Sequence, residues 1–164
     1  HHPRVNILNP GPGVGGHCIA VDPWFLISQN RDLSPLMAAA RAVNDGRPET
    51  VVSKVDSASQ QTGSKRVACL GLAYKPDVDD LRESPAIEIA SKLASQGYAV
   101  LVVEPNVSIL PEDLQAAGDV ALVSTDEALA TADIIVCLVG HSAFRTIGDK
   151  LAGKAVIDTV GLWR

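Results

Sequence analysis

Cysteine is scarce in this sequence of 164 residues, which holds only Cys18, Cys69 and Cys137. Three scattered cysteines are too few for a disulfide framework or a zinc cluster, so we expect neither disulfides nor a metal site. This cysteine usage is typical of a protein from a reducing, cytoplasmic setting.

Basic residues are in the minority, and long apolar runs are missing. Lys and Arg number 14 against 19 Asp and Glu, which gives a formal net charge of −5. A nucleic-acid binder usually presents a basic face, so this balance argues against one. No apolar stretch approaches the roughly 20 residues of a membrane-spanning helix, so we expect no membrane span. The first residue is not Met and no signal peptide follows it, which leads us to expect a piece of a longer chain.

Apolar residues make up 46% of the sequence, enough for the core of one domain with a flanking arm. The polar stretch SASQQTGSK at 57–65 predicts the boundary, with the arm at 1–62 and the domain at 63–164. Within the arm, helical spacing predicts two stretches separated by a break at Gly46 and Pro48.

The two helical stretches of the arm run from Pro35, directly after Ser34, to about Gln61. They carry more apolar surface than an isolated arm can hide. We therefore expect a homodimer formed through this helical arm.

After residue 65, five short apolar runs alternate with segments of helical length. Continuous Val, Ile and Leu runs are typical of parallel strands that are buried on both faces. We therefore predict a Rossmann-like, doubly wound α/β domain of about five parallel strands, with ligands at the carboxyl ends of the strands. The predicted strands are 66–70, 99–103, 120–123, 133–138 and 155–158, and the predicted helices include 85–96 and one that begins with a capping box at Ser124.

The run from Gly11 to Gly16, GPGVGG, matches the G-x-G-x-x-G pattern of dinucleotide-binding loops. That motif needs a helix directly after the loop, whereas the next residues contain β-branched side chains and end at Pro23. We therefore expect no dinucleotide site here. Two interpretations remain: a tight irregular loop, or a loop whose bare backbone approaches a ligand closely.

Cys18 follows the glycine loop, where little side-chain cover is available. A lone cysteine is usually a buried apolar residue, and we predict this for Cys69 and Cys137, which lie inside apolar strands. Cys18 is instead a candidate nucleophile, because a thiolate there could attack a carbonyl carbon. Asp22 shares a face with Cys18 if the chain is helical between them. It could orient a water, hold a lysine, or cap the short helix that begins at Pro23.

Lys75 and Arg82 lie between the first strand of the domain and a helix start at Ser84. Two cations beside a helix N-terminus suit a phosphate or diphosphate. Alternatively, the two cations only neutralise the neighbouring acids, which are Asp77, Asp79, Asp80 and Glu83.

Taken together, these segments resemble the UDP-glucose/GDP-mannose dehydrogenase family, most closely its branch that acts on UDP-N-acetyl-D-mannosamine. The segments that carry the resemblance are HPRVNILNPGPGVGGHCIAVDPWFL at 2–26, ARAVND at 40–45 and GLAYKPDVDDLRESPA at 71–86. The final DTVGLWR is similar to the family's DTRG-x-WR. The resemblance covers nearly the whole chain.

The resemblance implies an N-terminal NAD-binding domain, a central helical dimerisation region and a C-terminal UDP-binding domain. This chain would correspond to the end of the central region and the C-terminal domain, so NAD would be bound mainly by a part that the chain does not contain. The implied reaction oxidises the C6 alcohol of a UDP-sugar to a carboxylate in two NAD⁺ steps, for bacterial surface polysaccharides. The 164 residues alone would then be inactive.

Site residues also follow from the resemblance. Cys18 matches the nucleophile that forms a thiohemiacetal and then a thioester, and Asp22 matches the acid that helps to activate water. Arg82 matches an arginine that faces NAD. The positions that match substrate-binding residues are His2, Arg4, Gly15, Tyr74 and Lys75, of which the first two would reach the substrate of the neighbouring subunit.

Two positions depart from the wider family pattern. Val21 stands where the glucose-specific enzymes carry lysine, in agreement with the N-acetylmannosamine branch. Val160 replaces the arginine of DTRG, which removes one substrate contact.

Two other classes of function are compatible with the sequence. One is a stand-alone nucleotide-sugar-binding module without turnover, which an upstream reading frame encoding a complete dinucleotide-binding domain would exclude. The other is a flavodoxin-like or receiver-like signalling domain that uses the acids near Asp79. That class predicts FMN or Mg²⁺ binding and gives Cys18 no role.

Overall fold

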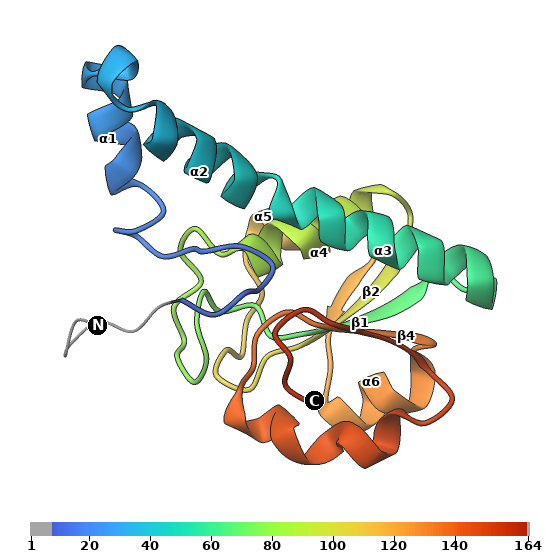
Figure 1. Cartoon of the computed structure of the whole chain (residues 1–164). Helices are drawn as coiled ribbons and strands as arrows, with labels where there is room; N and C mark the ends of the chain where they lie inside the picture. The colour runs from blue at the N-terminus through green and yellow to red at the C-terminus, as the bar shows by residue number, and fades with distance from the viewer. Residues whose placement is uncertain (1–7, 164) are drawn as a thin grey trace.

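The computed structural model describes residues 8–163, which form a parallel sheet covered by helices on both faces and an arm that projects from it (Figure 1). The sheet order is β3-β2-β1-β4-β5, so the chain winds outward from β1 in both directions and the predicted doubly wound fold is confirmed. The strands are β1 (Arg66–Leu70), β2 (Ala99–Val103), β3 (Val120–Leu122), β4 (Ile134–Cys137) and β5 (Ala155–Asp158). The helices are α1 (Asp22–Gln29), α2 (Pro35–Asp45), α3 (Arg47–Thr62), α4 (Pro85–Ser95), α5 (Glu112–Ala116) and α6 (Thr125–Thr131), with 3₁₀ segments η1 (Arg31–Leu33) and η2 (Ser142–Leu151).

Alternate side chains of β1 enter two separate cores, because successive residues of a strand point to opposite faces. Val67 and Cys69 belong to the core beneath α3 and α4. Ala68 and Leu70 belong to the core beneath α6 and η2. Continuous apolar runs are therefore required in the central strands, which explains why the sequence pattern located them.

The predicted strands agree with the structure to within one residue at either end, and β1, β2 and β5 match completely. Of the predicted capping box at the start of α6, the Ser124 half is confirmed, since the Glu127 backbone N–H donates to Ser124 Oγ at 3.2 Å. In the part of the chain that the structure describes, the Glu127 side chain makes no return hydrogen bond to the Ser124 N–H. The helices α5 and η2 were not predicted. The first has only five residues, and the second is a 3₁₀ helix, so neither shows the 3.6-residue period of a long α-helix.

The predicted break in the arm is confirmed at Gly46, which separates α2 from α3. The two helices differ in what they bury. Val51, Val52 and Val55 of α3 lie in the same core as the sheet. The expectation that all of Pro35–Gln61 offers a free apolar surface is therefore wrong for its α3 half.

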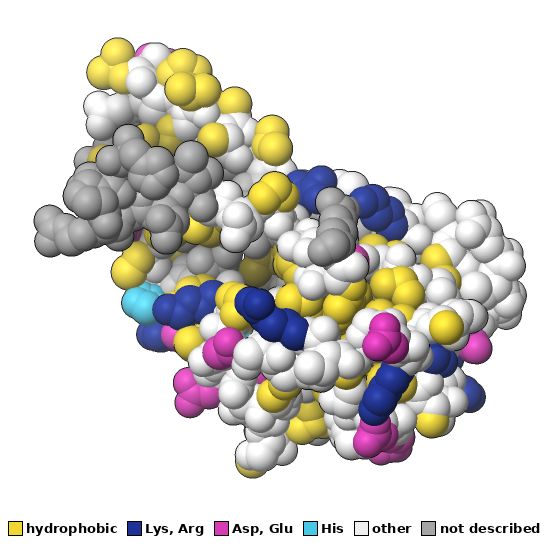
Figure 2. Space-filling model, turned by 60° about the horizontal axis from the view of Figure 1, so that its bottom comes forward, with side chains coloured by type: hydrophobic (Ala, Val, Ile, Leu, Met, Phe, Trp, Pro, Cys, Tyr) yellow, Lys and Arg dark blue, Asp and Glu magenta, His cyan; other side chains and the backbone are white. Residues whose placement is uncertain are grey.

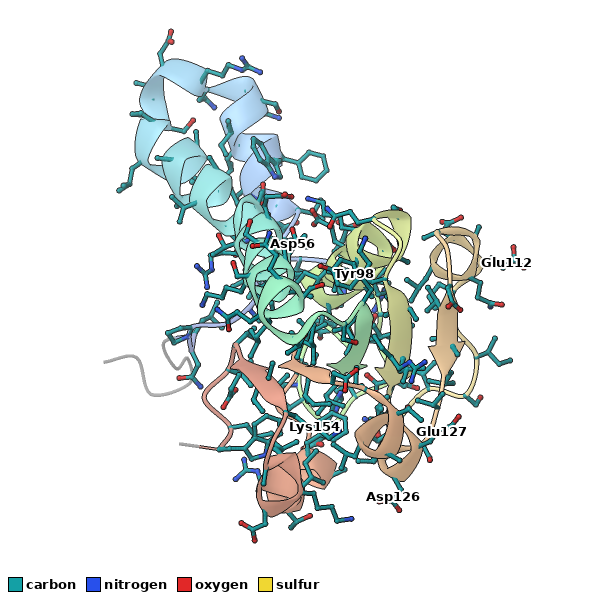
Figure 3. All side chains as sticks on the ribbon, turned by 90° about the vertical axis from the view of Figure 1, so that its right-hand side faces the viewer. Asp56, Tyr98, Glu112, Asp126, Glu127 and Lys154 are labelled. Atoms are coloured by element: carbon teal, nitrogen blue, oxygen red, sulfur yellow. The ribbon has the colours of Figure 1, made fainter. Side chains whose placement is uncertain are left out.

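A side-chain hydrogen bond also joins α3 to the sheet. Figure 3 labels Asp56 on α3 and Tyr98, which lies just before β2, and the Tyr98 hydroxyl donates to Asp56 Oδ1 at 2.7 Å. Tyr98 is buried, and burial is the main reason that its phenol pKa is raised. Packing thus continues across the predicted boundary at residue 62, and α3 covers the sheet.

The exposed apolar side chains of the arm lie on α1, η1 and α2, and Figure 2 shows apolar groups gathered on this projecting part. The largest exposed fractions are those of Leu33 at 86% and Leu36 at 82%, followed by Val43 at 71% and Phe25 at 63%. A patch of this kind on a folded domain usually marks a surface that another protein surface covers. Within residues 8–163, no helix combines the length and hydrophobicity that a bilayer crossing requires.

Candidate functional site

A cleft with a volume of about 670 Å³ lies at the carboxyl ends of the central strands. Its walls come from the connections after β1, β4 and β5, the first residues of α4, and the glycine loop. This is the edge at which doubly wound sheets bind their ligands, beside the point between β1 and β4 where the strand order reverses. The predicted ligand edge of the sheet is thus a real cavity, and the glycine loop closes one side of it.

The glycine loop does not open a helix, since α1 begins only at Asp22. Its glycines instead allow close packing on the segment that follows β1. A β-carbon placed on Gly15 would lie 2.2 Å from the Glu83 carbonyl oxygen, and one on Gly16 would lie 2.9 Å from the Tyr74 ring. The Gly16 N–H also donates to the Arg82 carbonyl at 3.2 Å. The dinucleotide interpretation is therefore rejected, and the bare backbone of the loop lines the cleft.

Tyr74 and Lys75, which the family resemblance assigns to substrate binding, both line the cleft. The Lys75 Nζ lies 5.3 Å from the centre of the Tyr74 ring, within the range of a cation–π contact. Among the described residues, no carboxylate forms an ion pair with Lys75. Its charge is therefore available to a ligand anion, and the alternative of simple neutralisation does not hold for this lysine.

The N-terminus of α4 adds partial positive charge to the same wall. Ser84 is the N-cap residue, and its Oγ accepts a hydrogen bond from the Ala86 N–H at 3.3 Å. Ser84, Pro85 and Ala86 all line the cleft. A helix N-terminus and a lysine on one wall favour an anionic group such as a phosphate.

Arg82 lies outside the lining of the cleft and is engaged locally. It donates twice to Asp80, at 2.9 and 2.6 Å, and these hydrogen bonds are the main reason that its pKa is raised and that the Asp80 pKa is held well below its ordinary range. The His17 Nδ1 lies 3.9 Å from the same carboxylate. The neutralising interpretation of the sequence therefore describes Arg82, whereas it fails for Lys75.

Cys18 and Asp22 lie on one helical turn beside the cleft, which confirms the condition for their sharing a face. The Asp22 N–H donates to the Cys18 carbonyl at 2.8 Å, and the Val21 N–H donates to the same oxygen at 3.0 Å. Cys18 is exposed. The alternative of a capping role for Asp22 fails, because Val21 is the N-cap of α1 and no side chain caps this helix. Cys18 does not itself line the cleft, but its neighbour Ile19 does.

Cys69 and Cys137 are fully buried in β1 and β4, as predicted. Burial raises the pKa of each thiol to about 12, with a smaller contribution from the Asp158 charge at Cys137. Both side chains are therefore unreactive apolar fillers of the core. His2 and Arg4, which the sequence analysis assigned to substrate binding, lie outside the described residues.

The sequence analysis missed three residues of the cleft region. Arg145 of η2 lines the cleft, on the side where Val160 stands in place of the family's arginine. Glu104 and His141 lie buried beneath it, at the carboxyl ends of β2 and β4. Glu104 could have been found from the sequence, because it is a charged residue directly after an apolar strand. His141 could not, because only the order of strands in the sheet places it beside Glu104.

Two models of one protein family match this chain. The model described as "UDP-glucose/GDP-mannose dehydrogenase family, UDP binding domain" matches residues 68–164, and the model of that family's central domain matches residues 1–46. A UDP-N-acetyl-D-mannosamine dehydrogenase of Escherichia coli (strain K12) is 50% identical over 173 aligned residues, which cover 99% of this chain and 41% of the relative. An NDP-N-acetyl-D-galactosaminuronic acid dehydrogenase of Ralstonia nicotianae is 49% identical, over 99% of this chain and 38% of the relative.

Solved structures of other proteins are also similar to nearly the whole of this chain. The structure of a UDP-D-ManNAc dehydrogenase from Pyrococcus horikoshii superposes with a TM-score of 0.81 at 28% identity, covering 99% of this chain and 38% of that one. A UDP-N-acetyl-mannosamine dehydrogenase from Staphylococcus aureus gives 0.76 at 35% identity, covering 98% and 38%. The chain thus spans about two fifths of the length of the relatives that it matches.

Proposed function

Because the chain belongs to the UDP-glucose/GDP-mannose dehydrogenase family, we propose that its cleft binds the nucleotide part of a UDP-sugar. We propose further that it is the C-terminal portion of an NAD-dependent UDP-sugar 6-dehydrogenase. UDP-N-acetyl-D-mannosamine is the proposed substrate, as in the name of the relative from Escherichia coli. The product, a nucleotide-linked uronate, would serve bacterial surface polysaccharides.

One observation carries this proposal: the glycine loop and the Tyr74-Lys75 turn form the two sides of a single cleft. Lys75 and the N-terminus of α4 supply positive charge for a diphosphate. Tyr74 supplies an aromatic surface beside them, and the glycine loop, which packs closely on Glu83 and Tyr74, presents its backbone to the cleft. Gly15, Tyr74 and Lys75 are therefore the proposed binding residues in the described part of the chain.

Cys18 and Asp22 have separate proposed roles in the second oxidation. The Cys18 thiolate attacks the C6 aldehyde carbon and forms a C–S bond, which gives a thiohemiacetal after protonation of the oxygen. Loss of hydride and a proton from this adduct leaves a thioester. Asp22 holds the water whose oxygen attacks the thioester carbon, and the C–S bond then breaks to release the carboxylate and the thiolate.

The hydride acceptor in such an oxidation is a nicotinamide cofactor, and the described sheet does not fit one. No G-x-G-x-x-G run follows β1, where the chain reads GLAYKP from Gly71. Glu104 occupies the end of β2, where dinucleotide-binding sheets place an acid for the ribose, but its side chain is buried and bonded to protein groups. We therefore propose that NAD is bound mainly by another part of the protein and that Arg82, which is exposed, faces it.

Only one residue of this chain, Val21, bears on the proposed choice of sugar. Val21, which replaces the lysine of the glucose-specific enzymes, favours an N-acetylated substrate. The relatives nevertheless carry names with two different sugars. The second candidate function, a nucleotide-sugar-binding module without turnover, predicts the same cleft and leaves Cys18 without a role.

Calorimetric titration of the 164-residue chain with UDP tests the binding proposal. Lys75→Met should weaken UDP binding by about tenfold or more, because a charge-assisted contact to phosphate is lost. Lys54→Met, on the exposed side of α3, is the matched control and should leave the affinity unchanged. Absence of UDP binding, or equal effects of the two variants, would overturn the proposal.

Turnover separates the two candidate functions. We expect no NADH from the 164 residues alone with UDP-N-acetyl-D-mannosamine and NAD⁺, since the described sheet is not a dinucleotide site. A protein that contains this chain together with a dinucleotide-binding domain should form two NADH per uronate. If that longer protein binds UDP but forms no NADH, the module without turnover is the correct function.

A further inference from the structure

Glu104 is a buried carboxylate on which five hydrogen-bond donors converge. Its Oε2 accepts the backbone N–H of Leu72 at 2.7 Å and of Ala73 at 3.1 Å. The same oxygen lies 3.1 Å from His141 Nε2. Its Oε1 accepts the N–H of Asn106 at 3.0 Å and the side-chain amide of that residue at 3.5 Å. Both oxygens of the carboxylate thus accept hydrogen bonds from protein groups.

Only one tautomer of His141 is compatible with this hydrogen-bond network. Its Nδ1 accepts the backbone N–H of Asp77 at 3.0 Å, so that nitrogen carries no proton. The proton therefore lies on Nε2 and is donated to Glu104, which makes the imidazole neutral. The ring is fully buried and packs edge-on against Phe144, with ring centres 5.4 Å apart.

Asp77 closes the network on the surface side. Its Oδ1 accepts the backbone N–H of Ser142 at 2.8 Å and the hydroxyl of the same residue at 3.0 Å. These two hydrogen bonds are the main reason that the Asp77 pKa is lowered. Asp77 also has a φ of +59°, a conformation that a non-glycine residue keeps only where the surroundings hold it.

The segment 72–77 is therefore tied down on both sides of Tyr74 and Lys75. Glu104 holds the two peptide groups that precede this pair, and His141 holds the peptide group two residues after it. Both tethers come from strands that flank β1, namely β2 and β4. The position of the cleft wall thus depends on buried groups that no ligand in the cleft can reach.

We propose that Glu104 and His141 are positioning residues that hold the 72–77 turn, and with it Tyr74 and Lys75, in the geometry that binds an anion. The identity of that anion as a UDP diphosphate rests on the proposed function; the positioning role does not. The pair supplies fixed, buried acceptors beneath the turn, which preset the wall before a ligand arrives.

An acceptor-only group is essential at residue 104. A glutamine has the same shape, but its NH₂ group would face either the Asn106 donors or the donors at Leu72 and Ala73. A switch of His141 to the other tautomer would not relieve the conflict, because an Nδ1–H would then face the Asp77 N–H. Burial tends to raise the Glu104 pKa, but hydrogen bonds from His141, Leu72 and Asn106 outweigh it and lower the pKa below its ordinary value.

The first test reads the tautomer of His141 in the unaltered chain. Nitrogen NMR of ¹⁵N-histidine-labelled chain at pH 7 should show one imidazole with a protonated Nε2 and an unprotonated Nδ1. The assignment can be made by comparison with a His141→Phe sample. The opposite tautomer, or an imidazolium, at His141 would overturn the proposal.

The second test is hydrogen exchange with Glu104→Gln. The amides of Leu72, Ala73 and Asp77 should exchange about tenfold faster or more than in the unaltered chain, since the charged acceptor that holds the turn is lost whichever way the new amide group faces. Amides at the centre of α3 should be unaffected. Glu104→Asp keeps an acceptor-only group and should restore part of the protection. Equal acceleration throughout the chain, or none in the turn, would show that the pair is merely structural or irrelevant.

UDP titration of the same variants separates this proposal from the proposed function. Glu104→Gln should weaken UDP binding by at least about tenfold while cooperative unfolding persists. If the unaltered chain binds no UDP, the proposed function fails, and the tautomer and the exchange rates still decide the positioning role. If UDP affinity is unchanged in Glu104→Gln, the positioning role fails and the proposed function stands.

Discussion

Asn44, near the end of α2, binds both polar backbone atoms of Val14 in the glycine loop. Its Oδ1 accepts the Val14 N–H at 2.8 Å, and its Nδ2 donates to the Val14 carbonyl at 3.4 Å. The Asn44 side chain thus bonds the N–H and the C=O of Val14, as a neighbouring strand would in a sheet. Since Val14 lines the cleft, the arm contributes to the cleft through this contact.

Replacement of Asn44 tests this contact. Asn44→Ala leaves a partly buried N–H and C=O without partners, so we expect a loss of about 1 to 2 kcal/mol in the free energy of unfolding. UDP affinity should fall by several fold because the loop loses its fixed position. Asn44→Asp retains the acceptor for the Val14 N–H and should recover part of both losses. Urea unfolding and calorimetry measure the two quantities, and an unaltered Asn44→Ala protein would contradict the role.

Cys18 should differ from the other two cysteines in chemistry. If the proposed function holds, Cys18→Ser in a longer protein that contains this chain and a dinucleotide-binding domain should lower turnover by orders of magnitude while UDP-sugar binding survives, because a hydroxyl is a far poorer nucleophile than a thiolate. Cys69→Ser and Cys137→Ser should mainly reduce stability, since a hydroxyl in those buried strands needs a partner. Steady-state NADH formation and ligand affinity distinguish the cases. Near-normal turnover in Cys18→Ser would exclude it as the nucleophile.

The buried thiols predict a loss of stability at high pH. Folding raises the pKa of Cys69 from an ordinary value of 9.0 to about 12, so its neutral form is favoured in the folded state. This contribution is fully present below pH 9 and is lost as the pH rises toward 12, because the unfolded thiol ionises first. At pH 10 the loss is about 1 to 2 kcal/mol for this thiol. Cys69→Ala should therefore show a flatter decline in unfolding free energy between pH 9 and 11, and parallel curves would disprove this linkage.

Arg145 should contribute to anion binding from the side of the cleft where Val160 stands. Arg145→Gln should weaken UDP binding by several fold and reduce its dependence on salt, because one cation is removed from the lining. Lys150→Gln is a matched control on the same helix, since Lys150 pairs with Asp126 at 3.1 Å instead. Titrations at two salt concentrations provide the measurement. Equal effects of the two substitutions would mean that only net charge matters.

The exposed apolar patch on α1 and α2 predicts self-association. We expect a homodimer by light scattering, with the contact on this part of the arm rather than on α3, whose valines are buried. Replacement of Leu33 and Leu36 by Lys should shift the mass to that of a monomer, since both side chains are almost fully exposed in the single chain. A monomer at high protein concentration before any substitution would refute the expectation.

The sequence located the sheet well because parallel strands buried on both faces must be apolar throughout. It also located the β1 connection with Tyr74 and Lys75, since that connection follows the first strand directly. The hydrogen bonds by which Glu104 and His141 hold the 72–77 turn could not be predicted from the sequence. Glu104 and His141 are 37 positions apart and meet only because β2 and β4 flank the same strand. A sequence pattern predicts where the strands are, but it does not predict which strands are neighbours in the sheet.

The glycine loop shows a second limit of what could be predicted from the sequence. Its composition left a tight loop and a ligand-facing loop equally open, and the structure contains features of both. Gly15 and Gly16 are needed because the loop packs directly on Glu83 and Tyr74. The same packing turns the loop backbone toward the cleft. A pattern that permits close approach does not reveal whether the approaching group is protein or ligand.

The central position of β1 has a consequence for synthesis of the chain. This strand leaves the ribosome before either of its partners, and β4 is completed only at Cys137, after β2 and β3 have been made. Until then one edge of an apolar strand is unpaired, which exposes the nascent chain to association with other strands. The cleft wall at 72–77 forms even later, because His141 follows β4. Premature termination before residue 141 would therefore give an aggregation-prone product that also lacks a formed cleft.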